Sequence, residues 1–325
     1  RLVGSEMCIR DSLKGLVPSV TFTPDDLELA KGAMSVRRAA LDALGSQLSA
    51  NHYLIRRDYE KVLRHKNRLL KDEAPAALVG AMNETLVTCG AQLSCYRAAL
   101  FEKLAASMAS YYAEITDGHE RLDAGFVPSW EEHDPLSFAT RTFGRDEARE
   151  ALADALARRG GEERVRKRAL VGPHADRIEF FIDGKNAALF GSQGQQRSVV
   201  LAFKLAEATL IQDFLRQKPV LLLDDVMSEL DAARRRALVA FISGDIQTFI
   251  TTTNLAYFDD DLLGGARIVE LEKPRKTGEM PDEDRMFHVK HSPIDAQPAR
   301  GEAEERDGQP SDPAEQPSAR IEGDS

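Results

Sequence analysis

The sequence predicts an α/β protein in which a parallel sheet and its helices follow a long helical insertion and precede a disordered tail. Three observations favour this fold class. Residues 219–223 form a continuous apolar run, which is typical of a strand buried on both faces of a parallel sheet. Residues 199–208 form a strongly helix-favouring segment ahead of that strand. Apolar residues also recur with helical spacing between 86 and 115.

The helical insertion comes first along the chain. We expect one or two helices between residues 35 and 71, with a break near Gly45 and Ser49. A further helix is expected over 76–115, where the apolar residues form one stripe that packs on neighbouring helices. The stripe consists of Leu86, Leu93, Leu100, Leu104, Met108, Tyr111 and Ile115. This pattern indicates a core-facing surface and not a metal or cofactor site.

Two further elements separate this insertion from the parallel sheet. A helix over 147–158 is expected to end at the glycine pair 160–161. Residues 177–190 then predict a hairpin, because apolar and polar residues alternate before an Asp183-Gly184 turn. The alternating apolar residues are Ile178, Phe180 and Ile182.

Two adjacent carboxylates follow the predicted buried strand. Asp224 and Asp225 come at its C-terminal end, where the ligands of open α/β sheets bind. Because neighbouring charges at a buried strand end need a cation, we expect Asp224 to hold Mg²⁺ and Asp225 to face an attacking water. The alternative is that both residues only begin a turn and cap a helix near Asp231. The strand by itself leaves the two interpretations equal.

A polar segment precedes the helix at 199–208. Its residues are Ser192, Gln193, Gly194, Gln195, Gln196 and Arg197. Ser192 and Gly194 therefore lie at or just before a helix N-terminus, where unpaired backbone N–H groups and the helix dipole can bind a phosphate oxygen. The alternative is an ordinary N-cap in a glutamine-rich loop, and the segment alone does not decide between them.

Taken together, these segments resemble the bacterial RecF family of DNA replication and repair proteins, which belongs with the SMC and Rad50 proteins to the ABC-type ATPases. The resemblance implies that residues 192–197 are the signature motif, and that Asp224 and Asp225 are the catalytic Walker B pair. It assigns the D-loop to Ser228, Glu229, Leu230 and Asp231. A strand over 248–253 resembles the one that leads to the switch residue, at Thr253 or Asn254.

The resemblance extends from about residue 17 to about residue 271. Further matching segments are residues 22–27, 37–38, 41–42, 59–71 and 172–176. The sequence departs from the family pattern in two ways: no phosphate loop of the form G-x-x-x-x-G-K-[ST] occurs in it, and Ala175 replaces a basic residue after Gly-Pro-His. Residues 1–12 do not fit the family. We interpret them as a non-native segment, and we expect the chain to be truncated at its N-terminus.

The resemblance also implies a domain organisation, which is that of an incomplete ABC-type (P-loop NTPase) ATPase head with an inserted α-helical lobe. The expected parts are the end of the first ATPase lobe at 13–34, helical lobe II at 35–165, the C-terminal part of the ATPase core at 166–275, and a disordered acidic tail at 276–325. Composition supports the tail, because residues 278–325 contain eight of the ten net negative charges and few apolar residues.

The family resemblance implies the function. We expect an ATP-dependent homodimer in which the signature motif contacts ATP in trans, with Mg²⁺ as the metal cofactor and weak ATPase activity in the full-length protein. The chain as given is expected to be inactive alone. The expected roles are binding of single-stranded or gapped DNA, RecA loading with RecO and RecR, recombinational repair and SOS induction. The expected location is the cytoplasm, in association with the nucleoid.

Other features restrict the alternatives. No apolar run is long enough to cross a membrane. Cys89 and Cys95 do not have a zinc-ligand spacing and are interpreted as reduced, mostly buried thiols, and His174 is interpreted as structural. Basic clusters at 56–71, 164–168 and 234–236 permit DNA binding but are each more typical of a solvated helix face. A transport-type ABC subunit and a noncatalytic DNA-clamp or scaffold fragment remain as alternative functions.

Overall fold

The computed structural model describes residues 17–131, 142–243, 246–258 and 263–270. The chain divides into two units, residues 1–259 and 260–325. In the second unit, the Ala266 N–H donates a hydrogen bond to the Leu263 carbonyl. The segments 1–12 and 276–325, to which the sequence assigns a non-native stretch and an acidic tail, lie outside the described residues.

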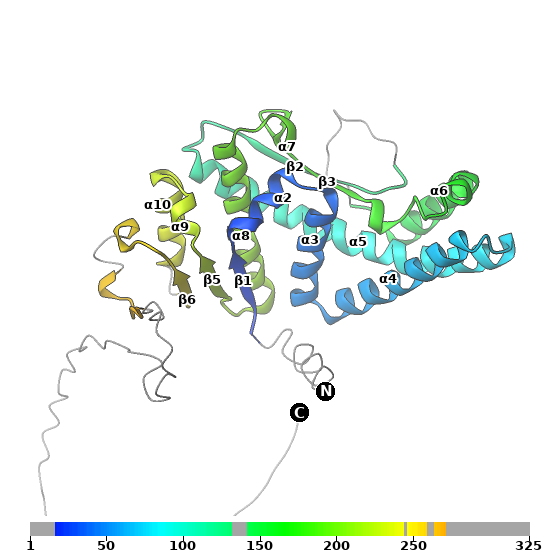
Figure 1. Cartoon of the computed structure of the whole chain (residues 1–325), viewed down its shortest axis with the longest axis horizontal. Coiled ribbons are helices and arrows are strands. Elements are labelled where there is room, and N and C mark those ends of the chain that lie inside the picture. The colour runs from blue at the N-terminus through cyan, green and yellow to red at the C-terminus, as the bar shows by residue number, and fades with distance from the viewer. Residues whose placement is uncertain (1–16, 132–141, 244–245, 259–262, 271–325) are drawn as a thin grey trace, which may run out of the picture. The chain divides into compact units, whose positions relative to one another are not determined.

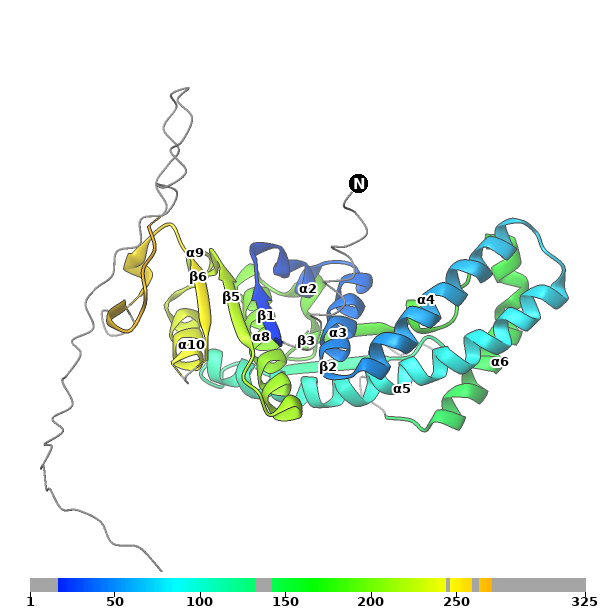
Figure 2. The same ribbon diagram turned by 90° about the horizontal axis from the view of Figure 1, so that it is seen from below.

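A three-stranded parallel sheet lies at one end of the first unit, and the long helices extend from it (Figure 1, Figure 2). Its strands are β1 (Ser19–Phe22), β5 (Val220–Asp224) and β6 (Thr248–Thr251), in the order β1-β5-β6. β5 is the central strand, with Leu221 opposite Val20 on one side and Thr248 on the other. The predicted strand is therefore confirmed, and its C-terminal end lies beside that of β6.

The expectation that this strand is buried on both faces is wrong. Leu221 and Leu223 are buried, but Leu222 is 38% exposed. Leu222 pairs with Thr21 on one side and with Phe249 on the other, and Phe249 is 59% exposed. This exposed row runs across all three strands, because the helices in the described part of the chain leave that face of the sheet open.

A second sheet is antiparallel and consists of β2 (Leu122–Val127), β3 (Arg177–Ile182) and β4 (Lys185–Asn186). The predicted hairpin is confirmed at β3 and β4. Asp183 and Gly184 form its two-residue turn with φ angles of 49° and 76°, as a type I′ turn requires. β2 was not expected. It pairs along its whole length with β3, with Leu122 opposite Ile182.

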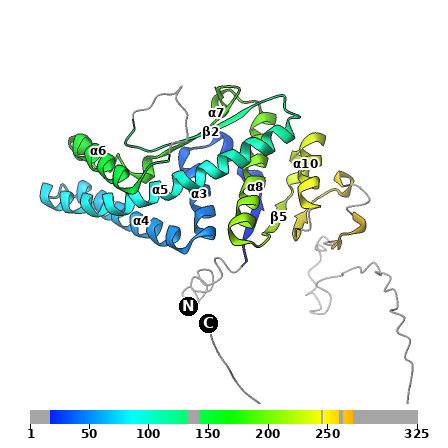
Figure 3. The same cartoon turned by 180° about the vertical axis from the view of Figure 1, so that it is seen from behind.

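Four helices account for most of the insertion: α3 (Met34–Leu48), α4 (Ala50–Lys71), α5 (Ala76–Ile115) and α6 (Arg145–Arg166). α5 is about 60 Å long at 1.5 Å per residue. Its first half packs with α4 and α6, and its second half packs on α8 (Gln193–Leu215) (Figure 3). The core of the first half includes Tyr59, Leu86, Leu93, Leu152, Leu156 and Val171. The bounds predicted for α5 are confirmed.

Neither glycine signal in this region ends a helix, whereas the break predicted near Ser49 is present. The chain does break at Ser49, whose side chain caps α4 by accepting from the His52 N–H. It does not break at Gly45, where a Cβ would lie 2.5 Å from the His52 ring. The expected helix end at Gly160 and Gly161 is wrong, because α6 continues to Arg166. A buried ion pair between Glu163 and Lys66, with atoms 2.7 Å apart, holds this last part of α6 against α4. Such tertiary contacts outweigh a cost of about 1 kcal/mol per helical glycine.

Shorter elements complete the first unit. They are η1 (Pro24–Leu27), α2 (Glu28–Lys31), η2 (Pro173–Ala175), α7 (Ala187–Phe190), α9 (Val226–Glu229), α10 (Ala232–Ile242) and η3 (Leu255–Tyr257). α8 lies between α5 and β1, so it joins the helical insertion to the parallel sheet. Among the described residues, no helix combines the length and the apolar character needed to cross a membrane.

Candidate ATPase half-site

The C-terminal end of β5 places both predicted carboxylates beside β6. Asp224 ends the strand, and its Oδ1 accepts a hydrogen bond from the Thr251 hydroxyl at 2.6 Å. The Asp225 N–H lies 3.1 Å from the Thr251 carbonyl and 3.1 Å from its hydroxyl. Sequence reasoning missed Thr251. The parallel pairing that sets Asp224 opposite Thr251 could have indicated it.

Asp225 has two unusual features. Its backbone is left-handed, with φ 48° and ψ 27°, and it precedes α9. A non-glycine residue in this region is rare, and aspartate and asparagine tolerate it best. Its Oδ1 atom is buried without a hydrogen-bond partner in the described structure. Buried polar atoms are nearly always paired, so this oxygen is available for a water, a cation or a ligand.

The carboxylates fit a magnesium ion that is completed by phosphate. No group of three or more His, Cys, Asp or Glu side chains arranged to hold a metal occurs within the described residues. Mg²⁺ in nucleotide sites usually takes only one or two carboxylates and fills its other positions with water and substrate phosphates. Asp224 Oδ2, which makes no hydrogen bond in the described structure, is a ligand atom of that kind.

The predicted signature motif begins α8. Ser192 is its N-cap, with its hydroxyl accepting from the Gln195 N–H at 3.2 Å while the Gln195 side chain accepts from the Ser192 N–H at 2.8 Å. The N-cap interpretation is therefore correct as local structure. It leaves the phosphate interpretation open, because Ser192 and Gln193 are exposed and the serine hydroxyl can still donate.

Contacts within the protein hold the other residues of the motif in place. The Gln196 side chain is buried and donates to the Ala187 carbonyl at 3.1 Å. The Gln195 amide donates to Glu120 at 2.8 Å. At Gly194, a Cβ would lie 3.2 Å from the Arg234 guanidinium, so the absence of a side chain permits the close approach of α10.

Two arginines connect the motif to the predicted D-loop. Arg197 forms an ion pair with Glu229, and Arg234 forms one with Asp231 while its Nε donates to Ser198 at 2.8 Å. The structure thus brings the N-terminus of α8 and the D-loop together. Arg197 was predicted as part of the motif without its partner Glu229, and Arg234 was predicted only as a member of the basic cluster 234–236.

The D-loop residues also have local structural roles. The Ser228 hydroxyl donates to the Asp225 carbonyl at 2.8 Å, Leu230 is buried, and Asp231 caps α10 by accepting from the Arg234 N–H at 3.0 Å. The alternative interpretation, in which Asp224 and Asp225 only begin a turn and cap a helix near Asp231, is correct in that Asp225 leads from β5 into α9. It is wrong for the cap, because Asp231 itself caps α10. It does not account for the unpaired Asp225 oxygen.

The predicted switch residues lie after β6. Asn254 caps η3 by accepting from the Ala256 N–H at 2.9 Å, and both Thr253 and Asn254 are exposed. In the described structure, neither forms a hydrogen bond with Asp224 or Asp225, whereas Thr251 does. Their assignment as switch residues stays a prediction.

The Gly-Pro-His segment is structural. His174 Nδ1 lies 2.6 Å from the Tyr59 hydroxyl, and its Nε2 lies 3.2 Å from the Ala169 carbonyl. Burial lowers the pKa of His174 to about 4, so the ring is neutral at physiological pH. Gly172 has a φ of 135°, and a Cβ there would lie 2.5 Å from the Tyr59 hydroxyl. The segment therefore packs against α4 through Tyr59.

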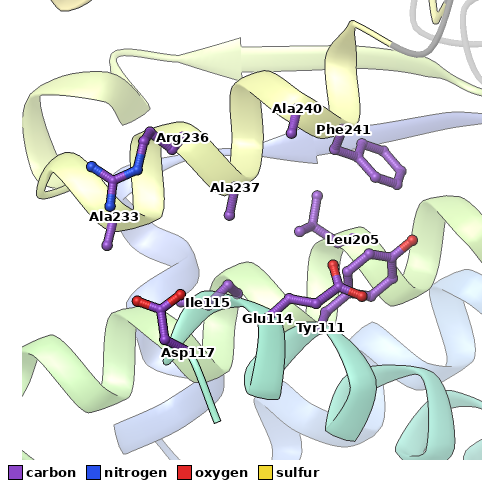
Figure 4. A pocket seen from close by; sticks show the side chains of 10 residues that line it. All are labelled: Tyr111, Glu114, Ile115, Asp117, Leu205, Ala233, Arg236, Ala237, Ala240 and Phe241. Carbon is purple, nitrogen blue, oxygen red and sulfur yellow. The ribbon is translucent and has the colours of Figure 1, made fainter. Parts of the chain in front are cut away.

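Two remaining features lie away from this site. A cavity of about 410 Å³ lies between the end of α5, α8 and α10, with Tyr111, Glu114 and Arg236 in its lining (Figure 4). It contains none of the predicted site residues. Cys89 and Cys95 are free and half-buried, less buried than expected, and burial raises the pKa of the Cys89 thiol to about 11.

No protein-family model matches the chain. The chain is 37% identical over 259 residues to the DNA replication and repair protein RecF of Lactobacillus delbrueckii subsp. bulgaricus, a match that covers 78% of this chain and 66% of the relative. It is 36% identical over 274 residues to the RecF protein of Rippkaea orientalis, covering 79% of this chain and 70% of that relative. The chain belongs to the RecF family. The family predicted from the motifs is thus confirmed.

Solved structures agree with this assignment. The structure of the recombination mediator protein RecF-ATPrS in the RecFOR pathway matches with a TM-score of 0.68 and 31% identity, over 76% of this chain and 65% of that chain. The RecF-ATP structure matches to the same extent. The predicted class, an α/β ABC-type ATPase head, is confirmed. The chain spans slightly less than two thirds of the Lactobacillus relative.

Proposed function

We propose that this RecF-family chain supplies the signature-motif and D-loop half of a composite ATP site, and that it acts with DNA in replication and repair. One observation supports this most strongly. The exposed N-terminus of α8 is tied through Arg197 and Arg234 to the segment that follows Asp225. An exposed phosphate-binding helix end and a carboxylate pair are therefore held as one rigid unit.

The signature half acts on a nucleotide held by a second molecule. The Ser192 hydroxyl and the Gly194 N–H donate to the γ-phosphate, since the N-terminus of α8 has free N–H groups and a positive dipole. Gln195 and Gln196 keep this helix end in place through Glu120 and the Ala187 carbonyl. The second molecule contributes the phosphate loop, which this sequence does not contain.

When the chain is joined to a phosphate loop of its own, the carboxylates serve a nucleotide bound on their own side. Asp224 holds Mg²⁺, directly or through water, with Thr251 fixing its orientation. The ion neutralises the charge on the phosphates when it is bound. Asp225 accepts a hydrogen bond from the attacking water through its unpaired Oδ1 and orients it. Turnover is slow, because the site is complete only while two heads are closed.

DNA is the partner of the ATP-dependent dimer. The basic residues exposed along α4 are Arg57, Lys61, Arg64, Arg68 and Lys71, and they suit the phosphate backbone of single-stranded DNA or of a single-strand to duplex junction. The RecFOR pathway named for the solved relatives supports RecO and RecR as partners in RecA loading, recombinational repair and SOS induction. The location that goes with this proposal is the cytoplasm, at the nucleoid.

The experiment uses the chain joined at residue 17 to the segment of the Lactobacillus relative that precedes the matched region, where the family resemblance places the phosphate loop. With ATP, this chimera dimerises and hydrolyses ATP slowly. Asp225→Asn lowers turnover by roughly 100-fold or more and traps the dimer. Asparagine tolerates the left-handed backbone at this position, so the fold is preserved. Unchanged turnover in Asp225→Asn rejects Asp225 as the catalytic carboxylate.

A further inference from the structure

Two large apolar side chains are exposed immediately before the signature motif. Leu189 is 76% exposed and Phe190 is 71% exposed, and both belong to the short helix α7. Single exposed apolar residues are common, but an adjacent pair at this exposure beside a candidate site is characteristic of a contact surface.

The protein holds this pair in a fixed position. Asn186 caps α7 by accepting from the N–H groups of Ala188 and Leu189, at 3.0 and 3.3 Å. The Ala187 carbonyl accepts from the Gly191 N–H and from the buried Gln196 side chain, both at 3.1 Å. Because Gln196 belongs to the signature motif, α7 and the motif are parts of one rigid structure.

A glycine makes the tight turn between them possible. At Gly191, a Cβ would lie 2.5 Å from the Ala187 carbonyl oxygen. Ser192 follows directly as the N-cap of α8. Two residues of chain span at most about 7 Å, so the Phe190 Cα atom lies within that distance of the Ser192 Cα atom.

The chemistry of the surface indicates its partner. Residues 186–196 contain no charged side chain, and their exposed side chains are apolar, amide or, at Ser192, hydroxyl. Nucleic acid requires lysine or arginine against its phosphates, so this surface suits a protein. We propose that Leu189 and Phe190 form an apolar rim on which a second RecF-type head docks, and that they set the stability of the nucleotide-dependent complex. This inference rests on the proposed function, in which that head binds over Ser192.

The test mixes this chain with the full-length Lactobacillus relative, in which the residue aligned with Ser192 is changed to arginine so that the relative does not form homodimers. The complex is measured by light scattering with and without ATP. Leu189→Ser combined with Phe190→Ser weakens the ATP-dependent complex about tenfold or more, because apolar area is no longer buried. ATP binding by the relative is unchanged, and Phe190→Leu retains the complex.

Phe214→Ser is the matched control. Phe214 is 49% exposed near the other end of α8, about 30 Å away along the helix, and its substitution leaves the complex unchanged. If Ser192→Arg abolishes the complex but the Leu189 and Phe190 substitutions do not weaken it, the apolar rim is rejected and the proposed function stands. If the unaltered chain forms no ATP-dependent complex, or if Ser192→Arg leaves the complex intact, both are rejected.

Discussion

Arg97 on α5 connects the helical insertion to the Gly-Pro-His segment, and its replacement by methionine tests this connection. Its guanidinium donates to both oxygens of Asp42, at 2.8 and 2.7 Å, and to the Pro173 carbonyl at 2.6 Å. It also lies 3.4 Å from Asp176. All three charged side chains are at least nine-tenths buried. Arg97→Met therefore leaves two buried carboxylates without their cation.

The expected loss follows from this burial. Removing one member of a buried ion pair costs about 3–5 kcal/mol, which corresponds to a fall of about 6–20 °C in the melting temperature of a domain of this size. Burial alone would raise the pKa of Asp42, but hydrogen bonds from Arg97 and His52 outweigh it and lower that pKa to about 2. Asp42 thus contributes about 2 kcal/mol of stability above pH 4, and this is lost as the pH falls through 2.

Urea unfolding followed by circular dichroism measures the effect. Arg166→Met is the control, because Arg166 pairs with Glu162 on an exposed part of α6 and is worth at most about 1 kcal/mol. Adding Asp42→Asn to Arg97→Met recovers part of the loss, since it removes one of the uncompensated charges. A loss below about 1 kcal/mol in Arg97→Met would show that the network does not join these elements.

Two other predictions concern stability. Gly172→Ala destabilises the protein by about 2 kcal/mol or more, because Gly172 has a φ of 135° and an added Cβ would collide with the Tyr59 hydroxyl. Gly160→Ala, in an open part of α6, stabilises the protein by up to about 1 kcal/mol. Equal changes in the free energy of unfolding for the two variants, measured by thermal unfolding, would contradict this prediction. Burial raises the pKa of Glu207 from 4.5 to about 7, despite the Lys204 ammonium, so stability falls as the pH rises from 4.5 to 7. Glu207→Gln reduces this pH-dependent fall in the free energy of unfolding by up to about 3 kcal/mol. If the variant shows the same pH dependence of unfolding as the unaltered chain, Glu207 is not the group responsible.

The elements that the sequence predicted are those with local causes. The start of α8 follows from the Ser192 capping box, and the hairpin follows from the Asp183-Gly184 turn, which needs two positive φ angles. The strand β5 follows from its apolar run. The exposure of one face of β5 could not be predicted from this run, because the exposure of Leu222 depends on which neighbouring elements cover the sheet.

The elements that the sequence did not predict depend on distant contacts. β2 contains Asp123 and Gly125, which are poor strand formers, and it exists because it pairs with β3 about 55 residues later. Thr251 reaches Asp224 only through the register of β5 and β6. The Arg234 contact with Ser198 likewise requires that α10 pack against α8. The candidate site was predictable as separate motifs, while the links between them were not.

The central claim is that Ser192 acts on a nucleotide held by another head. ATP turnover by the full-length Lactobacillus relative, with the residue aligned with Ser192 changed to arginine, tests this most directly when the present chain is added. We predict that the unaltered chain restores turnover and that the Ser192→Arg chain does not, while both chains unfold at the same temperature. Equal restoration by the two chains, or none by either, would contradict it.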